Sequence, residues 1–156
     1  MAETPDTANV VIHPPIAWAL ALLAGWAIDR LVPLPFIPAG APTGWLGAIV
    51  FALGAALAAW AFATMTRAGS NVPTNLPTTT IVDTGPYRLT RNPIYLGMML
   101  GLIGEAIAFN SLWPLVSLVA FALIIRYGVV AREEAYLERK FGDDYRRYRA
   151  RVRRWL

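Results

Sequence analysis

A run of arginine, tyrosine and proline residues at 85–97 carries the clearest chemistry in this sequence; it reads Gly-Pro-Tyr-Arg-Leu-Thr-Arg-Asn-Pro-Ile-Tyr-Leu-Gly. Asn92 and Pro93 predict the start of a helix, where backbone N–H groups are free to bind an anion. Arg88 and Arg91 flank that start, and guanidinium groups bind carboxylates and phosphates through paired hydrogen bonds. The run therefore predicts an anion-binding site, although Arg88 could equally anchor the chain at lipid headgroups.

An acidic pair, Glu133 and Glu134, lies further along the chain and is followed at 141–148 by Phe-Gly-Asp-Asp-Tyr-Arg-Arg-Tyr. Two carboxylates beside a cationic cofactor could balance its charge or accept hydrogen bonds from hydroxyl and amino groups. Taken alone, the pair would be an ordinary solvated helix face. Whether the pair belongs to a functional site depends on whether folding brings it close to residues 85–97.

Two charged residues fall inside apolar stretches, where ionisable side chains are candidates for function by default. Arg126 lies near the end of the stretch that leads to Glu133, so we expect it to reach the same site. Glu105 lies nearer the opposite end of the bundle, and we expect it to pack or to form a hydrogen bond there.

The elements that must position these residues follow from the composition, which is 56% hydrophobic and 15% charged. This is far more apolar than an ordinary soluble domain, and we expect the bilayer to be the solvent. The chain has no cysteine and one histidine, His13, which excludes disulfides, cysteine nucleophiles and the usual zinc sites. Any cofactor should be organic rather than a metal ion.

Four apolar segments predict an all-α integral membrane protein with about four transmembrane helices in one domain, residues 1–156. The segments are 10–28, 45–65, 94–109 and 112–131. Only Asn110 and Ser111 separate the last two, which predicts a tight hairpin. Small residues at 54–59 predict close helix packing. Beyond residue 131 the pattern becomes amphipathic, and Gly142 predicts a break between two short C-terminal helices.

Basic residues orient the bundle. Nine of the 14 lie at 132–154, and Arg67, Arg88 and Arg91 precede the third apolar segment. Because Lys and Arg concentrate on the cytoplasmic side, we expect an inner-membrane protein with both termini in the cytoplasm. The basic tail should contact anionic membrane lipid rather than nucleic acid. The proline- and threonine-rich segment 71–93 is expected to cover the helix ends and line a polar pocket, rather than form an exposed linker.

Together these motifs, spread over 73–155, resemble the isoprenylcysteine carboxyl methyltransferase family and the related phospholipid methyltransferases. The resemblance implies that S-adenosylmethionine binds at the cytoplasmic membrane surface and that a lipophilic acceptor enters from the bilayer. It implies a cofactor site made of Tyr87, Arg91, Asn92, Pro93, Tyr95, Gly97, Glu133, Glu134 and Tyr145. Arg88 and Arg126 are the catalytic candidates, expected to orient an anionic acceptor. Many relatives carry histidine where this chain has Asn92, which cannot exchange a proton near neutral pH.

Three functions are compatible with the sequence. The first is methyl transfer to a lipophilic carboxylate of the isoprenylcysteine type, the second is N-methylation of phospholipid amines, and the third is a non-catalytic membrane subunit. An amine must lose a proton before it attacks, and the sequence shows no dedicated base, which favours the carboxylate. The native acceptor and the oligomeric state are not determined by the sequence.

Overall fold

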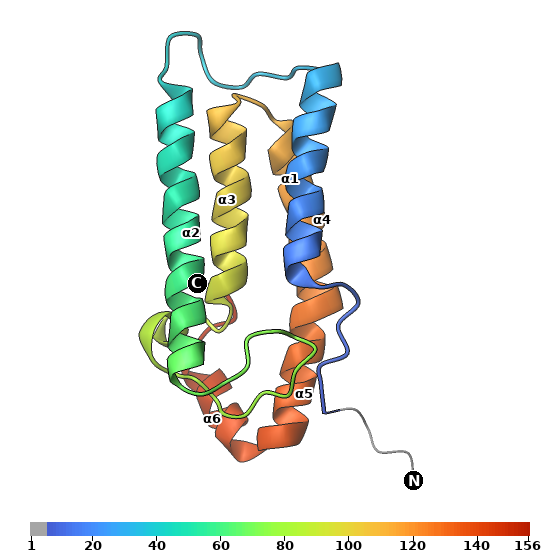
Figure 1. Cartoon of the computed structure of the whole chain (residues 1–156), viewed down its shortest axis with the longest axis vertical. Helices are drawn as coiled ribbons and strands as arrows, with labels where there is room; N and C mark the ends of the chain where they lie inside the picture. The colour runs from blue at the N-terminus through green and yellow to red at the C-terminus, as the bar shows by residue number, and fades with distance from the viewer. Residues whose placement is uncertain (1–5) are drawn as a thin grey trace.

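The computed structural model describes residues 6–156, and all regular structure in that range is helical. Helices α1 (Pro14–Leu31), α2 (Thr43–Arg67), α3 (Pro93–Ala108) and α4 (Trp113–Leu123) run along the long axis of the molecule (Figure 1). A π-helical segment, Ile124–Val130, joins α4 to α5 (Ala131–Phe141), and α6 (Asp143–Arg151) follows. A short 3-10 helix, Gly85–Arg88, precedes α3. The predicted all-α class is confirmed over this range.

Two helices are long and apolar enough to cross a membrane, namely α2 and the continuous helix Trp113–Phe141. Helix α3 is apolar but has only 16 residues. Helix α1 has 18 residues, but it begins with two prolines and carries Asp29 and Arg30 near its end. The prediction of about four spans is therefore supported by length and composition in two helices, and it stays a prediction for α1 and α3. The side on which the termini lie also stays a prediction.

Glycines bring α2 and α3 into backbone contact. Gly54 faces Gly97, and a Cβ atom on either residue would lie 2.5 Å from the carbonyl oxygen of the other. Gly47 and Gly104 repeat this arrangement further along the same two helices. Membrane helices associate largely through van der Waals packing, and small residues permit the closest approach. The packing role predicted for the small residues at 54–59 is confirmed at Gly54.

The hairpin between α3 and α4 is as tight as predicted. Asn110 has a φ of 48°, in the left-handed region that asparagine tolerates, and the Ser111 N–H donates to the Ala106 carbonyl at 2.9 Å. The Asn110 amide also exchanges hydrogen bonds of 2.7 and 2.9 Å with the backbone of Ile37. The hairpin is thereby fastened to the connection between α1 and α2. Helix α1 packs mainly against α4, while α2 packs mainly against α3.

The fourth helix does not end near residue 131 as expected. A π-helical segment carries it unbroken into α5, and the helix ends at Phe141. The change from apolar to charged side chains therefore marks where the helix leaves the apolar bundle, not where it stops. Gly142, with a φ of 53°, then provides the predicted break before α6. Helices α5 and α6 lie at the same end of the bundle as the start of α3 (Figure 1).

Candidate functional site

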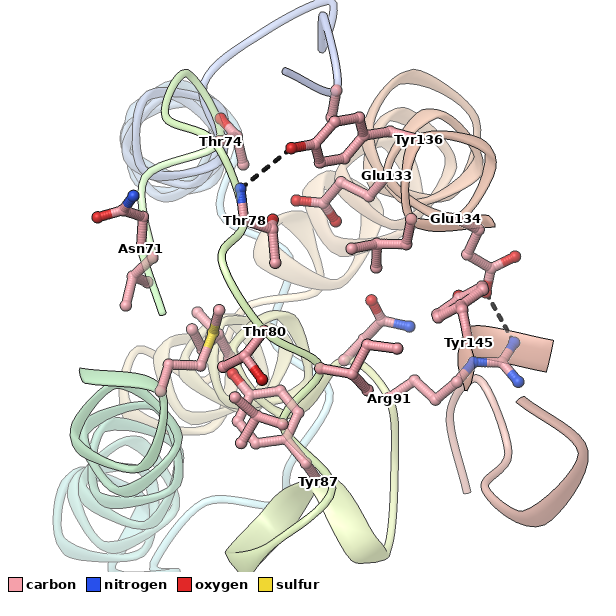
Figure 2. Close-up of a pocket in the computed structure, with 18 of the residues that line it drawn as sticks. Asn71, Thr74, Thr78, Thr80, Tyr87, Arg91, Glu133, Glu134, Tyr136 and Tyr145 are labelled. Carbon is pink, nitrogen blue, oxygen red and sulfur yellow. Dashed lines mark hydrogen bonds and ion pairs between the residues drawn. The ribbon is translucent and has the colours of Figure 1, made fainter. Parts of the chain in front are cut away.

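A cavity lies at this polar end, where the segments that precede and follow the α3–α4 hairpin meet (Figure 2). Its wall comes from the loop 71–82, the 3-10 helix, the start of α3, helices α5 and α6, Met65 near the end of α2, and Ala8 of the N-terminal segment. The polar residues of the wall are Asn71, Thr74, Thr78, Thr80, Tyr87, Arg91, Asn92, Tyr95, Glu133, Glu134, Tyr136, Tyr145 and Tyr148. The segment 71–93 thus lines a pocket, as predicted.

Local hydrogen bonds fix the loop 71–82 over the cavity. Asn71 Nδ2 donates to the Pro77 carbonyl at 2.8 Å, and Thr79 Oγ1 donates to the Gly69 carbonyl at 2.7 Å. The Thr78 N–H donates across the cavity to the Tyr136 hydroxyl at 3.1 Å (Figure 2). Proline fixes φ and so reduces the freedom that such a loop loses on folding. The loop is therefore an ordered part of the wall.

The N-terminal segment also belongs to the site, which the sequence did not reveal. The Tyr136 hydroxyl donates to Asp6 Oδ1 at 2.9 Å, and Lys140 Nζ donates to Asp6 Oδ2 at 2.7 Å. The Val11 N–H donates to the Gly128 carbonyl at 3.0 Å. Tyr136 thus links the N-terminal segment, the loop 71–82 and α5. Asp6 belongs to no motif ahead of the first helix, so the sequence gave no pattern from which this contact could be foreseen.

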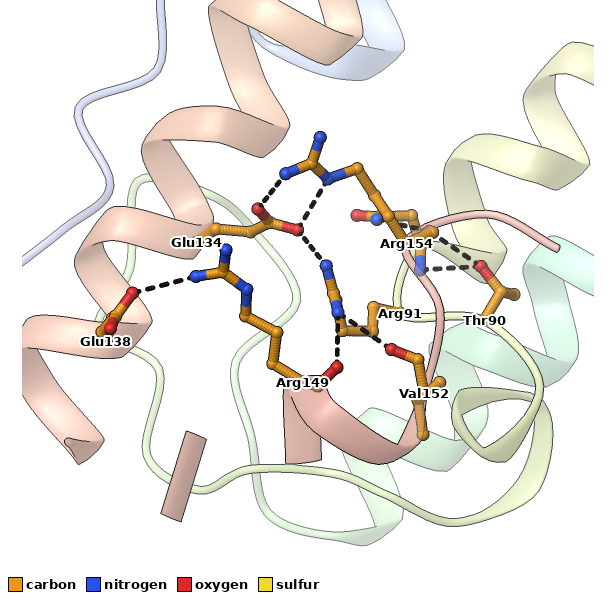
Figure 3. Close-up of polar contacts among 8 residues, drawn as sticks. Thr90, Arg91, Glu134, Glu138, Arg149, Val152 and Arg154 are labelled. Atoms are coloured by element: carbon orange, nitrogen blue, oxygen red, sulfur yellow. Dashed lines mark hydrogen bonds and ion pairs between the residues drawn. The ribbon is translucent and has the colours of Figure 1, made fainter. Parts of the chain in front are cut away.

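An ion cluster of Arg91, Glu134 and Arg154 forms one side of the site (Figure 3). Arg91 Nη2 donates to Glu134 Oε1 at 2.7 Å, while Arg154 donates to the two Glu134 oxygens at 3.0 and 2.6 Å. The Arg91 and Glu134 side chains are only 9% and 10% exposed. Such a buried pair is stable only when its remaining polar groups are also satisfied. Both Glu134 oxygens are satisfied by this cluster.

Backbone carbonyls of the C-terminal segment, residues 149–154, complete the cluster. The backbone N–H of Arg91 donates to Arg153, and its Nη1 donates to Val152 and Arg149, at 2.8–3.1 Å. Asn92 Nδ2 and Thr90 Oγ1 both donate to the Arg154 carbonyl, at 2.9 and 3.1 Å. The segment before α3 is therefore held by the chain end itself, and most donors of Arg91 are already used.

The two adjacent glutamates differ in charge environment. Burial alone would raise the pKa of Glu134, but hydrogen bonds and charge from Arg154 and Arg91 outweigh it and hold the pKa below its usual value. Burial raises the pKa of Glu133 to about 7, against the lowering effect of the hydrogen bond that the Tyr95 hydroxyl donates at 2.8 Å. Glu134 is therefore a fixed anion, whereas Glu133 changes its charge near neutral pH.

Three tyrosines of the wall, Tyr87, Tyr145 and Tyr148, stay protonated. Burial raises the pKa of Tyr145 to about 12 and raises the pKa values of Tyr87 and Tyr148 as well. The Tyr148 hydroxyl donates to the Tyr87 carbonyl at 2.9 Å, which ties α6 to the 3-10 helix. These residues therefore offer aromatic surface and neutral hydroxyl groups rather than charge.

Eight of the nine residues expected at the cofactor site line this one cavity: Tyr87, Arg91, Asn92, Pro93, Tyr95, Glu133, Glu134 and Tyr145. Their role in cofactor binding stays a prediction. Asn92 directly precedes α3 as expected, but its side chain makes no cap hydrogen bond. Its amide donates to the Arg154 carbonyl instead, so the helix start is fixed from outside the helix.

Three predicted site residues lie elsewhere. Gly97 is at the α2 contact, where Gly54 approaches it. Arg88 and Arg126 are both exposed and do not line the cavity; the Arg126 guanidinium lies 5.5 Å from the centre of the Tyr127 ring. The fold therefore does not bring Gly97, Arg88 and Arg126 to the cavity that the other eight residues line. Glu105 is 8% exposed, and its Oε2 has no hydrogen-bond partner within residues 6–156.

Sequence reasoning also missed Thr90, Tyr136 and Arg154. In the sequence, Arg154 is one of several basic residues of the tail and has no feature that distinguishes it from them. Tyr145 and Tyr148 do indicate that the C-terminal helices pack against the protein, because aromatic residues at this spacing on a short amphipathic helix favour such packing. Among the described residues, no group of three or more His, Asp or Glu side chains could hold a metal ion.

Comparison with known proteins places this geometry in a family. Residues 42–144 match the model of the phospholipid methyltransferase family, which spans α2, the loop, the hairpin and α5. An uncharacterized protein of Haemophilus influenzae is 43% identical over 63 residues, which are 40% of this chain and the whole of that protein. No solved structure matches the chain. Since the family model covers well over half of the sequence, this membrane-helix chain belongs to the phospholipid methyltransferase family, whose members are methyltransferases acting on lipid or membrane substrates.

Proposed function

We propose that the cavity binds S-adenosylmethionine and that the chain uses it to methylate a lipid acceptor at the cytoplasmic face of the membrane. Family membership supports methyl transfer. The position of the cavity at the polar end of an apolar bundle supports an acceptor whose reactive group lies at the membrane surface. When bound, the cofactor would supply a methyl group activated by its sulfonium centre.

The wall of the cavity suits this cofactor in residue type. Tyr87 and Tyr145 offer aromatic surface for an adenine ring, while Asn71 and Thr78 offer polar groups for ribose hydroxyls. Arg91 Nε is buried and has no hydrogen-bond partner among the described residues. A buried donor without a partner is costly, and a carboxylate such as that of the methionine moiety would satisfy it.

We propose a phospholipid amine as the acceptor. One observation carries this choice: Glu133 is the lining residue that combines a carboxyl with an oxygen not bonded to the described chain. The lining Arg91 is bound to Glu134, and Arg88 and Arg126 lie outside. A cationic headgroup amine is complementary to a free carboxylate. Glu133 also supplies a candidate proton acceptor, which the sequence alone did not show.

A lipophilic carboxylate of the isoprenylcysteine type is the second candidate. It is favoured by Arg91 Nε, because this buried donor could hold the acceptor carboxylate instead of the cofactor. The in-line displacement would then need no proton acceptor. Arg88 and Arg126 would have to approach the acceptor from outside the cavity.

Methyl-labelled S-adenosylmethionine and membrane lipid separate the two candidates. Purified protein in lipid nanodiscs should place label on a lipid amine, and alkaline treatment should leave that label on the non-volatile headgroup, because an N-methyl bond is stable to base. Nanodiscs without protein are the control. Label released as volatile methanol would identify a methyl ester and refute the amine proposal.

A calorimetric titration with S-adenosylmethionine tests the shared premise. We expect saturable binding at one site per chain. Absence of both binding and product would favour the third possibility, a membrane subunit without catalysis.

A further inference from the structure

A second hollow, the α3–α4 groove, lies on the surface of the bundle between α3 and α4. Its volume is about 380 Å³, and it shares no lining residue with the cavity at the polar end. Gly101 meets Trp18 of α1 on another side of α3, so α1 leaves the groove open. Val119 and Leu123 in its wall are 60% and 53% exposed. Every lining side chain is apolar: Leu96, Met99, Leu100, Ile103, Leu118, Val119, Ala122 and Leu123.

A cation lies where this groove approaches the polar end of the bundle. Arg126 follows Leu123 by three residues and Ala122 by four, a spacing that places side chains on one face of a helix. Arg126 is exposed, and within residues 6–156 its guanidinium forms no ion pair or hydrogen bond. The guanidinium lies 5.5 Å from the centre of the Tyr127 ring, which is 65% exposed. The apolar groove therefore ends at an unpaired positive charge.

The depth of Arg126 suits a lipid headgroup. Arg126 lies six residues, or roughly 9 Å along the helix, before Arg132, the first charged residue of α5. An arginine can bury its stem along apolar surface while its guanidinium extends toward the membrane surface, where it binds phosphate through paired hydrogen bonds. A lipid with its phosphate at Arg126 would have its acyl chains beside Leu96 and Leu123, the two lining residues nearest the polar end.

We propose that the α3–α4 groove holds one acyl chain of an anionic membrane phospholipid and that Arg126 binds the phosphate of that lipid. An anionic headgroup fits better than a zwitterionic one, because the zwitterion brings its own cation close to the phosphate. The site is one of binding alone. It does not depend on methyl transfer, and it would stand if the proposed function failed.

A helix from a second copy of the chain fits the groove less well. Membrane helices that pack closely use small residues, as Gly54 and Gly97 do between α2 and α3. The groove offers one small lining residue, Ala122, among long side chains such as that of Met99. An apolar partner helix would also leave Arg126 unpaired within the membrane, which is costly. A mobile acyl chain needs no close backbone approach, and a phosphate pairs with the arginine.

Photolabelling tests the position of the chain. The probe is a phosphatidylglycerol with a diazirine midway along one acyl chain, added to purified full-length protein in detergent micelles. Mass spectrometry of the digested protein should find the label within residues 96–103 and 118–123. Ala122→Phe fills the groove and should remove most of this labelling. Ala120→Phe is its control, because Ala120 is exposed on the same helix and does not line the groove; its labelling should match wild type.

Arg126→Gln tests the phosphate contact separately. Native mass spectrometry with phosphatidylglycerol should show about tenfold weaker binding of one lipid per chain, the effect expected from the loss of one charge-assisted hydrogen bond. Diacylglycerol with the same chains lacks the phosphate and should bind equally to wild type and to Arg126→Gln. Arg67→Gln is the control, since Arg67 is an exposed arginine at the end of α2 and outside the groove; its phosphatidylglycerol binding should match wild type.

Four results would overturn the inference. Label spread evenly over all helices would show annular lipid only. Phosphatidylglycerol binding that Arg126→Gln leaves unchanged would refute the phosphate contact. Equal weakening by Arg126→Gln and Arg67→Gln would show a general attraction between a basic protein and anionic lipid. A wild-type dimer that retains no lipid and that Ala122→Phe dissociates would assign the groove to a second copy of the chain.

Discussion

In the apolar bundle, α2 and α3 touch through glycine backbones, whereas at the polar end the chain segments are joined by side chains that donate to carbonyl oxygens. The first kind of contact depends on the absence of a side chain. The second depends on a few long side chains, chiefly Arg91 and Arg154. Apolar helices in a bilayer gain no hydrophobic free energy when they associate, whereas the polar end is joined through charged side chains. Substitutions in the bundle should therefore change its thermal stability, whereas substitutions at the polar end should detach chain segments or weaken cofactor binding.

Arg91→Ala should have the largest effect. It removes the ion pair with Glu134 and the donors to Val152 and Arg149, and breaking a buried pair from one side typically costs about 3–5 kcal/mol. We expect the C-terminal segment to detach and binding of S-adenosylmethionine to be lost in calorimetry. The helix content by circular dichroism should stay, because α2 and α3 do not depend on Arg91.

Arg147→Ala is the matched control, since Arg147 is exposed and, within residues 6–156, forms an ion pair only with Asp144 on its own helix. It should bind cofactor as wild type does. An Arg91→Ala protein with full cofactor affinity would contradict the assignment of the polar end to cofactor binding.

Gly54→Ala probes the other region. The added Cβ would lie 2.5 Å from the Gly97 carbonyl oxygen, and overpacking of this kind costs about 1–3 kcal/mol. Thermal unfolding in detergent should show a lower Tm. Gly44→Ala, on the same helix with no atom near its Cβ, should raise Tm slightly because alanine favours a helix over glycine by about 1 kcal/mol. Equal shifts in both variants would contradict the backbone contact.

Arg154→Lys tests the geometry of the cluster rather than its charge. A lysine keeps the positive charge but not the two-pronged contact with Glu134. We expect the loss of about one charge-assisted hydrogen bond, which contributes about 1.5–3 kcal/mol. Hydrogen-exchange measurements should show this loss as faster amide exchange in residues 149–154. The Tm of the bundle should be unchanged; a large fall would show that the two regions are coupled.

Tyr136→Phe should have the smallest effect. It removes the hydroxyl that joins Thr78 to Asp6, at a cost of about 1 kcal/mol for the neutral bond with the Thr78 N–H; the bond to the exposed Asp6 carboxylate adds little because water screens it. Limited proteolysis should cut the loop 71–82 faster than in wild type. Tyr127→Phe, which alters an exposed ring, is the control, and equal cleavage of both variants would show that Tyr136 does not hold the loop.

The sequence predicted the parts of this molecule that depend on side-chain pattern. The tight turn at Asn110 and the break at Gly142 follow from residue type and spacing, whereas a shared site of the Arg91 and Glu134 regions was implied by the family resemblance. The carbonyls of Val152, Arg153 and Arg154 could not be foreseen as partners, because every residue carries a carbonyl and its use depends on the tertiary fold.

Two other features of the structure could not be predicted from the sequence, for related reasons. The π-helical segment leaves no mark in hydropathy, so the fourth helix was expected to end where its charges begin. Arg88 and Arg126 were chosen by charge and by distance along the chain, but the direction in which a side chain points from a helix is set by rotation as well as by position.

That same π-helical segment, Ile124–Val130, fixes the angular phase of everything that follows it. Each residue of an ordinary α-helix advances the chain by about 100°, so winding the same residues at regular α-helical pitch, with none deleted, would turn α5 by roughly that amount. Glu133 and Glu134 are neighbours that differ by the same angle. The wide turn thus decides which of two identical side chains meets the Tyr95 hydroxyl and which meets the arginines.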